Sequence, residues 1–177
     1  MRPLLLLLAL AAALALVACG DDDDSEPAAQ TDGGASTTEE PSPSAQREAL
    51  KDTSTEPVIP KPTGSPPRRL VKEDIVKGKG KPVQPGDGIL LHYVGVTFST
   101  NQEIDSSWDR AQPLPVLLGV TRVIEGWSRG LVGMRKGGRR LLTIPPELAY
   151  GPEGDPPDIP PNETLVFVLD ALDVEHR

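Results

Sequence analysis

The stretch Val123-Ile124-Glu125-Gly126-Trp127 is the most informative part of the chain, because it places one of only two tryptophans beside a glycine and shortly after two β-branched residues. Tryptophan, tyrosine and phenylalanine together number only six, and all six lie between residues 93 and 167. Since tryptophan is usually highly buried, the stretch by itself is typical of a hydrophobic core. Its neighbours in the sequence favour a binding site: Tyr93, Asp105 and Arg110 before it, Ala149-Tyr150-Gly151 and Phe167 after it.

Residues 1–18 have the composition of a secretory signal peptide. Met1-Arg2-Pro3 carries one positive charge, and an apolar run of leucine, alanine and valine follows from Leu4 to Ala18. A run of this length is short for a helix that spans a bilayer and typical of the apolar region of a signal peptide. We therefore expect the protein to be exported.

The signal peptide ends in Leu16-Val17-Ala18-Cys19, which resembles the lipobox of bacterial lipoproteins, where small residues precede a cysteine that is diacylated. Cys19 is the only cysteine, so it cannot form an internal disulfide, and lipidation accounts for an unpaired cysteine in an exported protein. Buried acyl chains stabilise membrane attachment by about 0.8 kcal/mol per CH₂. The resemblance implies an extracytoplasmic lipoprotein anchored to the cell membrane through Cys19. The alternative is an ordinary secretory signal followed by an incidental cysteine.

Residues 19–67 are predicted to form a disordered, acidic tether rich in Pro, Ser and Thr. They contain no aromatic residue and carry 11 acidic and 3 basic residues, whereas residues 68–177 carry 15 acidic and 14 basic ones. The net charge of −8 therefore resides in the tether. High charge with low hydrophobicity prevents a segment from burying enough apolar surface to fold. The run Asp21–Asp24 is a weak candidate for a metal site, because nothing fixes its geometry.

Residues 68–177 have the size of one domain. Turn signals such as Pro85-Gly86-Asp87-Gly88 separate runs rich in β-branched, leucine and aromatic residues. These runs predict strands at 68–77, 89–98, 104–108, 114–118, 139–144 and 164–174, while only 124–131 suits a short helix. Many strands with one short helix predict an α+β fold, in which an antiparallel β-sheet packs on that helix.

Nine short motifs between residues 85 and 175 resemble, in order and spacing, those of the FKBP-type peptidyl-prolyl cis-trans isomerases. They are Pro85-Gly86-Asp87, His92–Gly95, Asp105–Ser107 with Asp109-Arg110, Val123-Ile124 with Gly126-Trp127, Gly130-Leu131 with Gly133-Met134, Leu142–Pro145, Ala149–Gly151, Ile159–Asn162 and Thr164–Phe167. The resemblance implies a twisted antiparallel β-sheet wrapped around one short α-helix, which agrees with the pattern of strands.

The resemblance also implies catalysis of rotation about X-Pro peptide bonds, which has a barrier of about 18–20 kcal/mol. Because no covalent bond is made or broken, we expect no metal, no cofactor and no nucleophile. The implied partners are X-Pro segments of unfolded or partly folded exported proteins, the membrane through the lipid on Cys19, and a macrolide inhibitor. We expect no nucleic-acid partner, and a monomer is the default expectation.

The family's pocket residues match positions of this chain. Trp127 is expected to be the floor beneath the proline ring, and the walls are expected from Tyr93, Val123, Ile124, Ile159 and Phe167. The backbone N–H of Ile124 and the hydroxyl of Tyr150 are expected to donate hydrogen bonds to substrate carbonyls. For Tyr93 and Phe167, a purely structural place in the core is the alternative.

Asp105 is expected at the pocket edge, where it orients the twisted amide, with Arg110 as its ionic partner. A partly buried carboxylate needs such a partner. The alternative is an ion pair that braces the loop and has no part in catalysis.

The chain departs from the family in two places. Three aliphatic residues stand where the family usually has aromatic ones, so we expect an aliphatic rim, modest turnover and weak tacrolimus binding: Ile104, Leu114 and Val116. Asp155 and Asp158 stand where many relatives have a neutral, basic or apolar residue, which predicts a different substrate preference.

The two histidines are not expected to act in catalysis. His92 lies one position out of phase with Tyr93 on a predicted strand, so the two side chains point to opposite faces. His176, beside the C-terminus, is expected to be solvated.

A second function class remains open: a binding module or chaperone with the FKBP fold and little or no isomerase activity. The intact pocket set favours an enzyme, and the loss of the rim aromatics favours the alternative. A solute-binding lipoprotein is disfavoured, because a single domain leaves no cleft between domains.

Overall fold

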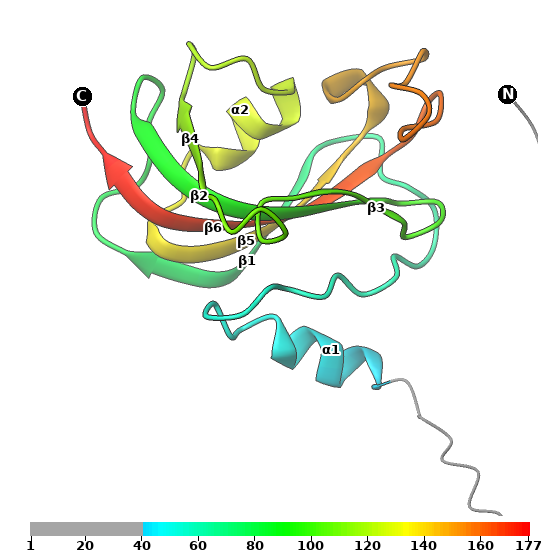
Figure 1. Ribbon diagram of the computed structural model, residues 1–177, viewed down its shortest axis with the longest axis horizontal. Helices are drawn as coiled ribbons and strands as arrows, with labels where there is room; N and C mark the ends of the chain where they lie inside the picture. The colour runs from blue at the N-terminus through cyan, green and yellow to red at the C-terminus, as the bar shows by residue number, and fades with distance from the viewer. Residues whose placement is uncertain (1–40) are drawn as a thin grey trace, which may run out of the picture. The chain divides into compact units, whose positions relative to one another are not determined.

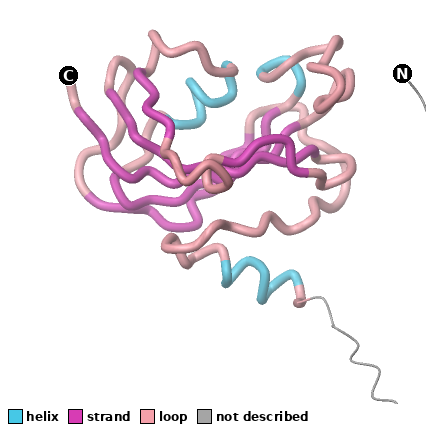
Figure 2. The backbone as a smooth tube through the Cα atoms, viewed as in Figure 1, coloured by secondary structure: helices cyan, strands magenta, loops and turns pink. Residues whose placement is uncertain are grey.

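The computed structural model describes residues 41–177 (Figures 1 and 2), so the predicted signal peptide, Cys19 and residues 20–40 of the tether lie outside the described residues. The described chain forms α1 (Pro43–Ala49), β1 (Val71–Lys79), β2 (Gly88–Thr97), β3 (Glu103–Ser106), β4 (Leu114–Leu117), α2 (Glu125–Leu131), β5 (Lys136–Ile144), the 3₁₀ turn η1 (Pro146–Leu148) and β6 (Leu165–Glu175). No helix among these residues is long and apolar enough to cross a membrane.

The strands form one antiparallel sheet in the order β1-β5-β6-β2-β3, and β4 pairs with β2 beyond the part covered by β3. The ladder between β2 and β6 runs from Gly88↔Glu175 to Thr97↔Leu165. The curved sheet carries α2 on its concave side (Figure 1). The predicted α+β fold is confirmed, although β1 begins and ends a few residues later than predicted.

Two glycines allow α2 to lie directly on β5. A Cβ at Gly126 would come within 2.3 Å of Ile144 Cγ2, and a Cβ at Gly130 would come within 2.3 Å of Leu142 Cδ1. Glycine weakens a helix, and a helix of seven residues is marginal by itself. The helix is therefore held by packing, and the close approach brings Trp127 onto the sheet.

Side chains alternate along the strands and form two apolar clusters, one on each face of the sheet. Tyr93 and Phe167 belong to the cluster beneath α2. Their neighbours in sequence, Val94 and Val168, belong to the cluster on the opposite face.

The opposite face is covered by residues 43–59, which we call the strap (Figure 2). Leu50 and Ile59 are 1% and 5% exposed and complete the second cluster. Glu56 accepts a hydrogen bond from the Ser106 hydroxyl at 2.7 Å, and the Asn101 amide donates to the Ile59 carbonyl at 3.3 Å. Residues 43–59 are thus ordered, which corrects the prediction that the disordered tether extends to residue 67.

Arg139 fixes the strap to the sheet. Its side chain is fully buried and pairs with Asp170, with Nε to Oδ1 at 2.5 Å and Nη2 to Oδ2 at 2.7 Å. The other guanidinium hydrogens are donated to the strap carbonyls of Leu50, Asp52 and Thr55, at 3.1, 2.7 and 3.0 Å. All five donors of the guanidinium are thereby used, which a buried charge requires.

Candidate functional site

A pocket of about 320 Å³ opens between α2, β2, β6 and the loop that follows η1. It is lined by Tyr93, Ile104, Asp105, Leu114, Arg122, Val123, Ile124, Trp127, Tyr150, Asp155, Asp158, Ile159 and Phe167. Larger hollows beside the strap and at the edge formed by β2 and β4 contain no aromatic side chain. An apolar pocket with a few convergent polar groups is the usual form of a binding site, so this pocket is the candidate.

Three packed aromatic rings form the pocket floor. Trp127 is 5% exposed, and its ring centroid lies 4.9 Å from that of Tyr93 and 5.2 Å from that of Phe167. Both contacts are edge-to-face, an arrangement that aromatic pairs favour. The indole Nε1 is buried and has no hydrogen-bond partner within residues 41–177. The floor is therefore closely packed and largely apolar.

Gly95 allows Phe167 to take its place in this floor. A Cβ at Gly95 would lie 2.2 Å from Phe167 Cε1, so any larger residue would displace the ring. Gly95 is paired with Phe167 across β2 and β6, which makes the clash unavoidable for a longer side chain. Gly95 belongs to one of the sequence motifs, and in the structure its lack of a side chain leaves the space that the Phe167 ring occupies.

Tyr93, Asp105 and Arg110 form a closed hydrogen-bonded triangle at the pocket edge. The Tyr93 hydroxyl donates to Asp105 Oδ2 at 2.5 Å, Arg110 Nη1 donates to Asp105 Oδ1 at 2.5 Å, and Arg110 Nη2 donates to the Tyr93 oxygen at 2.7 Å. The guanidinium also lies 5.8 Å from the centroid of the Tyr93 ring. The predicted ion pair is confirmed, and it fixes Tyr93 as well.

The triangle sets the ionisation of its members. Burial, followed by the hydrogen bond to Asp105, raises the pKa of Tyr93 to about 12. Burial alone would raise the pKa of Asp105, but the hydrogen bonds from Arg110 and Tyr93 lower this pKa overall. At neutral pH the site therefore holds a neutral phenol and a carboxylate neutralised by a guanidinium.

Two hydrogen-bond donors stand near the pocket floor. Ile124 is the N-cap residue of α2, and its backbone N–H has no backbone acceptor among the described residues. Tyr150 is 41% exposed, and its pKa is raised by burial and by the charges of Asp155 and Asp105. Its hydroxyl therefore remains protonated at neutral pH and can donate.

Nearly all predicted site residues meet in this pocket, but Val116 does not. Ile104 and Leu114 line the pocket as predicted, and Arg110 acts on it through Asp105 and Tyr93. Val116 is 2% exposed and belongs to the core. It lies on the same face of β4 as Leu114 but one two-residue step farther along the strand, beyond the rim.

Arg122 also lines the pocket, although no pattern in the sequence predicts it. It stands on an exposed loop outside every recognised motif, so no sequence signal marked it.

The histidines lie outside the pocket. His92 Nδ1 is 2.8 Å from the Ser107 hydroxyl, and the imidazole stacks on Trp108 with a centroid distance of 4.4 Å, on the face opposite Tyr93 as predicted. His176 is not simply solvated, because its Nδ1 lies 2.7 Å from Asp87 Oδ2. Within residues 41–177, no group of three or more His, Cys, Asp or Glu side chains gathers to hold a metal ion.

Comparisons with known proteins relate this chain to one family. Residues 79–172 match the model of a family described as FKBP-type peptidyl-prolyl cis-trans isomerase. An FK506-binding protein of Streptomyces anulatus is 48% identical over 119 residues, which cover 67% of this chain and 96% of that protein. The peptidyl-prolyl cis-trans isomerase FPR2 of Saccharomyces cerevisiae is 45% identical over 91 residues, covering 51% of this chain and 67% of that protein.

Two solved structures of proteins named as FKBPs are similar to this chain in sequence and in fold. The crystal structure of AtFKBP13 is 37% identical in sequence with a TM-score of 0.54, and the match covers 59% of this chain and 91% of that one. The N-terminal domain of FKBP42 from Arabidopsis thaliana is 26% identical with a TM-score of 0.60, covering 67% of this chain and 98% of that one.

Proposed function

The chain belongs to the FKBP-type peptidyl-prolyl cis-trans isomerase family, and from this premise we propose that it isomerises X-Pro bonds of exported proteins at the outer face of the cell membrane. The observation that carries the catalytic part is the floor of Trp127, Tyr93 and Phe167, with the Asp105 carboxylate fixed at its edge. The location is supported by the sequence that precedes and includes Cys19.

In this proposal the proline ring rests on Trp127, and the amide rotates in a site that excludes water. A twisted amide has less charge separation than a planar one, so it loses less on leaving water, and the dry pocket favours the transition state. The Ile124 N–H and the Tyr150 hydroxyl donate to substrate carbonyls and hold the segment on both sides of the bond. The Asp105 carboxylate, held by Arg110, orients the rotating group.

An isomerisation assay tests the catalytic part. Residues 41–177, which include the strap, are mixed with peptides that carry different residues before proline, and the cis-to-trans rate is followed. The uncatalysed exchange takes tens to hundreds of seconds, so an acceleration is readily measured. If no peptide of the panel is accelerated, the pocket serves as a binding or chaperone site instead.

The anchor makes a separate prediction: Cys19→Ser should leave the precursor unprocessed or release the protein from the membrane fraction. Serine cannot carry the acyl chains whose burial holds the domain at the bilayer. The measurement is the size and membrane fractionation of the full chain in its host, with Ser36→Ala in the same segment as the control. Equal processing and equal membrane retention of the Cys19→Ser and wild-type proteins would contradict lipidation of Cys19.

A further inference from the structure

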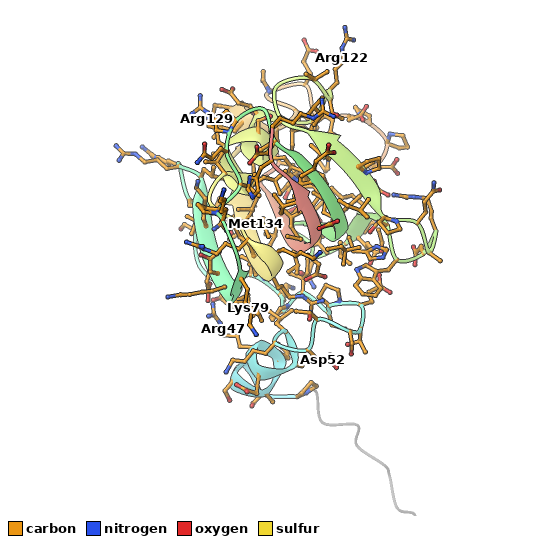
Figure 3. The ribbon with its side chains drawn as sticks, turned by 90° about the vertical axis from the view of Figure 1, so that its left-hand side faces the viewer. Arg47, Asp52, Lys79, Arg122, Arg129 and Met134 are labelled. Atoms are coloured by element: carbon orange, nitrogen blue, oxygen red, sulfur yellow. The ribbon has the colours of Figure 1, made fainter. Side chains whose placement is uncertain are left out.

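The mouth of the pocket carries unlike charges on two separate loops. Arg122 stands on the loop between β4 and α2, whereas Asp155 and Asp158 stand on the loop between η1 and β6. Both loops lie on the α2 side of the sheet (Figure 1), and Arg122 extends outward from the end of the molecule (Figure 3). All three residues line the pocket and are exposed, so a bound peptide can reach them.

These three charges are not neutralised by the protein itself. Within residues 41–177, none of them takes part in an ion pair, although many other charged side chains do. Asp105, the fourth charged residue of the pocket, is paired with Arg110. The field that a substrate meets at the mouth therefore comes from one free cation on one loop and two free anions on the other.

The acidic loop is held in one conformation. Asp155 and Ile159 exchange two backbone hydrogen bonds, each 2.9 Å long, and Asn162 N–H donates to the Gly151 carbonyl at 3.1 Å. Gly154 has a φ of +69°, and a Cβ there would lie 2.4 Å from the Ile159 carbonyl oxygen, so the turn is as tight as its backbone permits. Because Ile159 is itself a pocket wall, Asp155 keeps a set position beside the site.

Asp155 and Tyr150 line the same pocket, and both belong to the chain segment between η1 and β6. Arg122 stands two positions before Ile124 in the chain. On one side of the mouth the Tyr150 hydroxyl and the Asp155 carboxylate occur together. On the other side the Ile124 N–H and the Arg122 guanidinium occur together, so each donor for a substrate carbonyl is accompanied by a charge of a different sign.

We propose that the pocket selects X-Pro segments whose residues on the two sides of the proline carry opposite charges, with the cation toward Asp155 and Asp158 and the anion toward Arg122. The inference rests on the proposed function, because it assumes that a prolyl segment crosses the pocket between the two loops. Exposed ion pairs of this kind change an affinity roughly two- to fivefold each. The effect is thus a preference among substrates.

Two peptides of identical composition test the inference, one with Lys-Pro-Glu and one with Glu-Pro-Lys at its centre. Equal composition gives the two peptides the same net charge, so any attraction or repulsion by the overall charge of the protein is the same for both. We expect kcat/KM for the two orders to differ about fivefold at low ionic strength. The difference should shrink at high salt, where the charges are screened.

Variants show whether the loops cause the preference. Arg122→Gln and the double variant Asp155→Asn/Asp158→Asn should each reduce the ratio between the two orders, and Arg122→Glu combined with Asp155→Lys should reverse it. Glu153→Gln removes a charge from the same loop at a position that does not line the pocket, and it should leave the ratio unchanged. Equal kcat/KM for the two orders in the wild type, or a ratio that the charge-swapped variant retains, overturns the inference.

The two proposals fail in different ways. If isomerisation of a neutral Ala-Pro-Ala peptide is accelerated but kcat/KM is equal for the Lys-Pro-Glu and Glu-Pro-Lys peptides, the isomerase proposal is supported and the charge preference is contradicted. If no peptide is accelerated, the isomerase proposal falls, and calorimetric binding of the same two peptides decides the charge preference: unequal Kd values support it and equal values overturn it.

Discussion

Trp127→Leu is expected to lower kcat/KM for X-Pro isomerisation roughly 100-fold, because the proline ring loses the flat surface that positions it. A flexible aliphatic side chain also leaves the edges of Tyr93 and Phe167 without the ring against which they pack. Trp127→Phe keeps an aromatic floor of smaller area and should lose only part of the activity. The measurement is the isomerisation rate of residues 41–177 on a neutral X-Pro peptide.

Two controls separate catalysis from folding in this experiment. Truncation of a buried tryptophan costs roughly 3–5 kcal/mol, so near-ultraviolet circular dichroism must show that each variant is folded at the assay temperature. Trp108→Phe changes the other tryptophan, which stacks on His92 on the opposite face of the sheet, and it should leave the rate on the neutral peptide unchanged. Full activity in folded Trp127→Leu would show that the site lies elsewhere.

Arg139→Met is expected to destabilise the domain by about 3–5 kcal/mol, because it leaves the Asp170 carboxylate buried without a partner. The same change removes the donors for three strap carbonyls, so residues 43–59 should become open to proteolysis. Urea unfolding measures the first effect, and limited proteolysis followed by mass spectrometry measures the second.

Two further variants divide the role of Arg139. Arg47→Gln removes the exposed ion pair between Arg47 and Glu73, which also joins the strap to the sheet, and it should cost at most about 1 kcal/mol. In Arg139→Met/Asp170→Leu an apolar pair replaces the ionic one, so the sheet should regain much of its stability while the strap stays detached. A loss below 1 kcal/mol in Arg139→Met, with the strap still protected, would contradict the role of Arg139 as its anchor.

The sequence predicts those features of the fold that depend only on neighbouring residues within the same strand, helix or turn. The alternation in β2 was sufficient to separate Tyr93 from His92, and the glycines of α2 belonged to a recognisable motif. Most of the pocket was found because its residues lie in such motifs. The prediction for Val116 is wrong because the sequence shows which face of β4 a side chain takes but not how far along the strand the pocket extends.

The strap was missed for a different reason. Over residues 19–67 the composition is too polar for a segment that folds alone, and that inference is valid only for an isolated segment. Two buried side chains, Leu50 and Ile59, are enough to hold the strap on the sheet, because the sheet supplies the rest of the apolar cluster: Val94, Val96, Val166 and Val168. Nothing local to Arg139 shows that it reaches backbone carbonyls more than 80 residues earlier in the chain.

The arrangement of the strap determines how the domain responds to mechanical load. A pull on the chain at residue 41 acts first on the strap, beginning with α1, on the face of the sheet opposite the pocket (Figure 1). We expect the strap's hydrogen bonds to Arg139 to break in chain order, at Leu50, Asp52 and then Thr55, before tension reaches β1. Detachment of the strap should then take up the extension, while the rings that form the floor of the pocket keep their contacts.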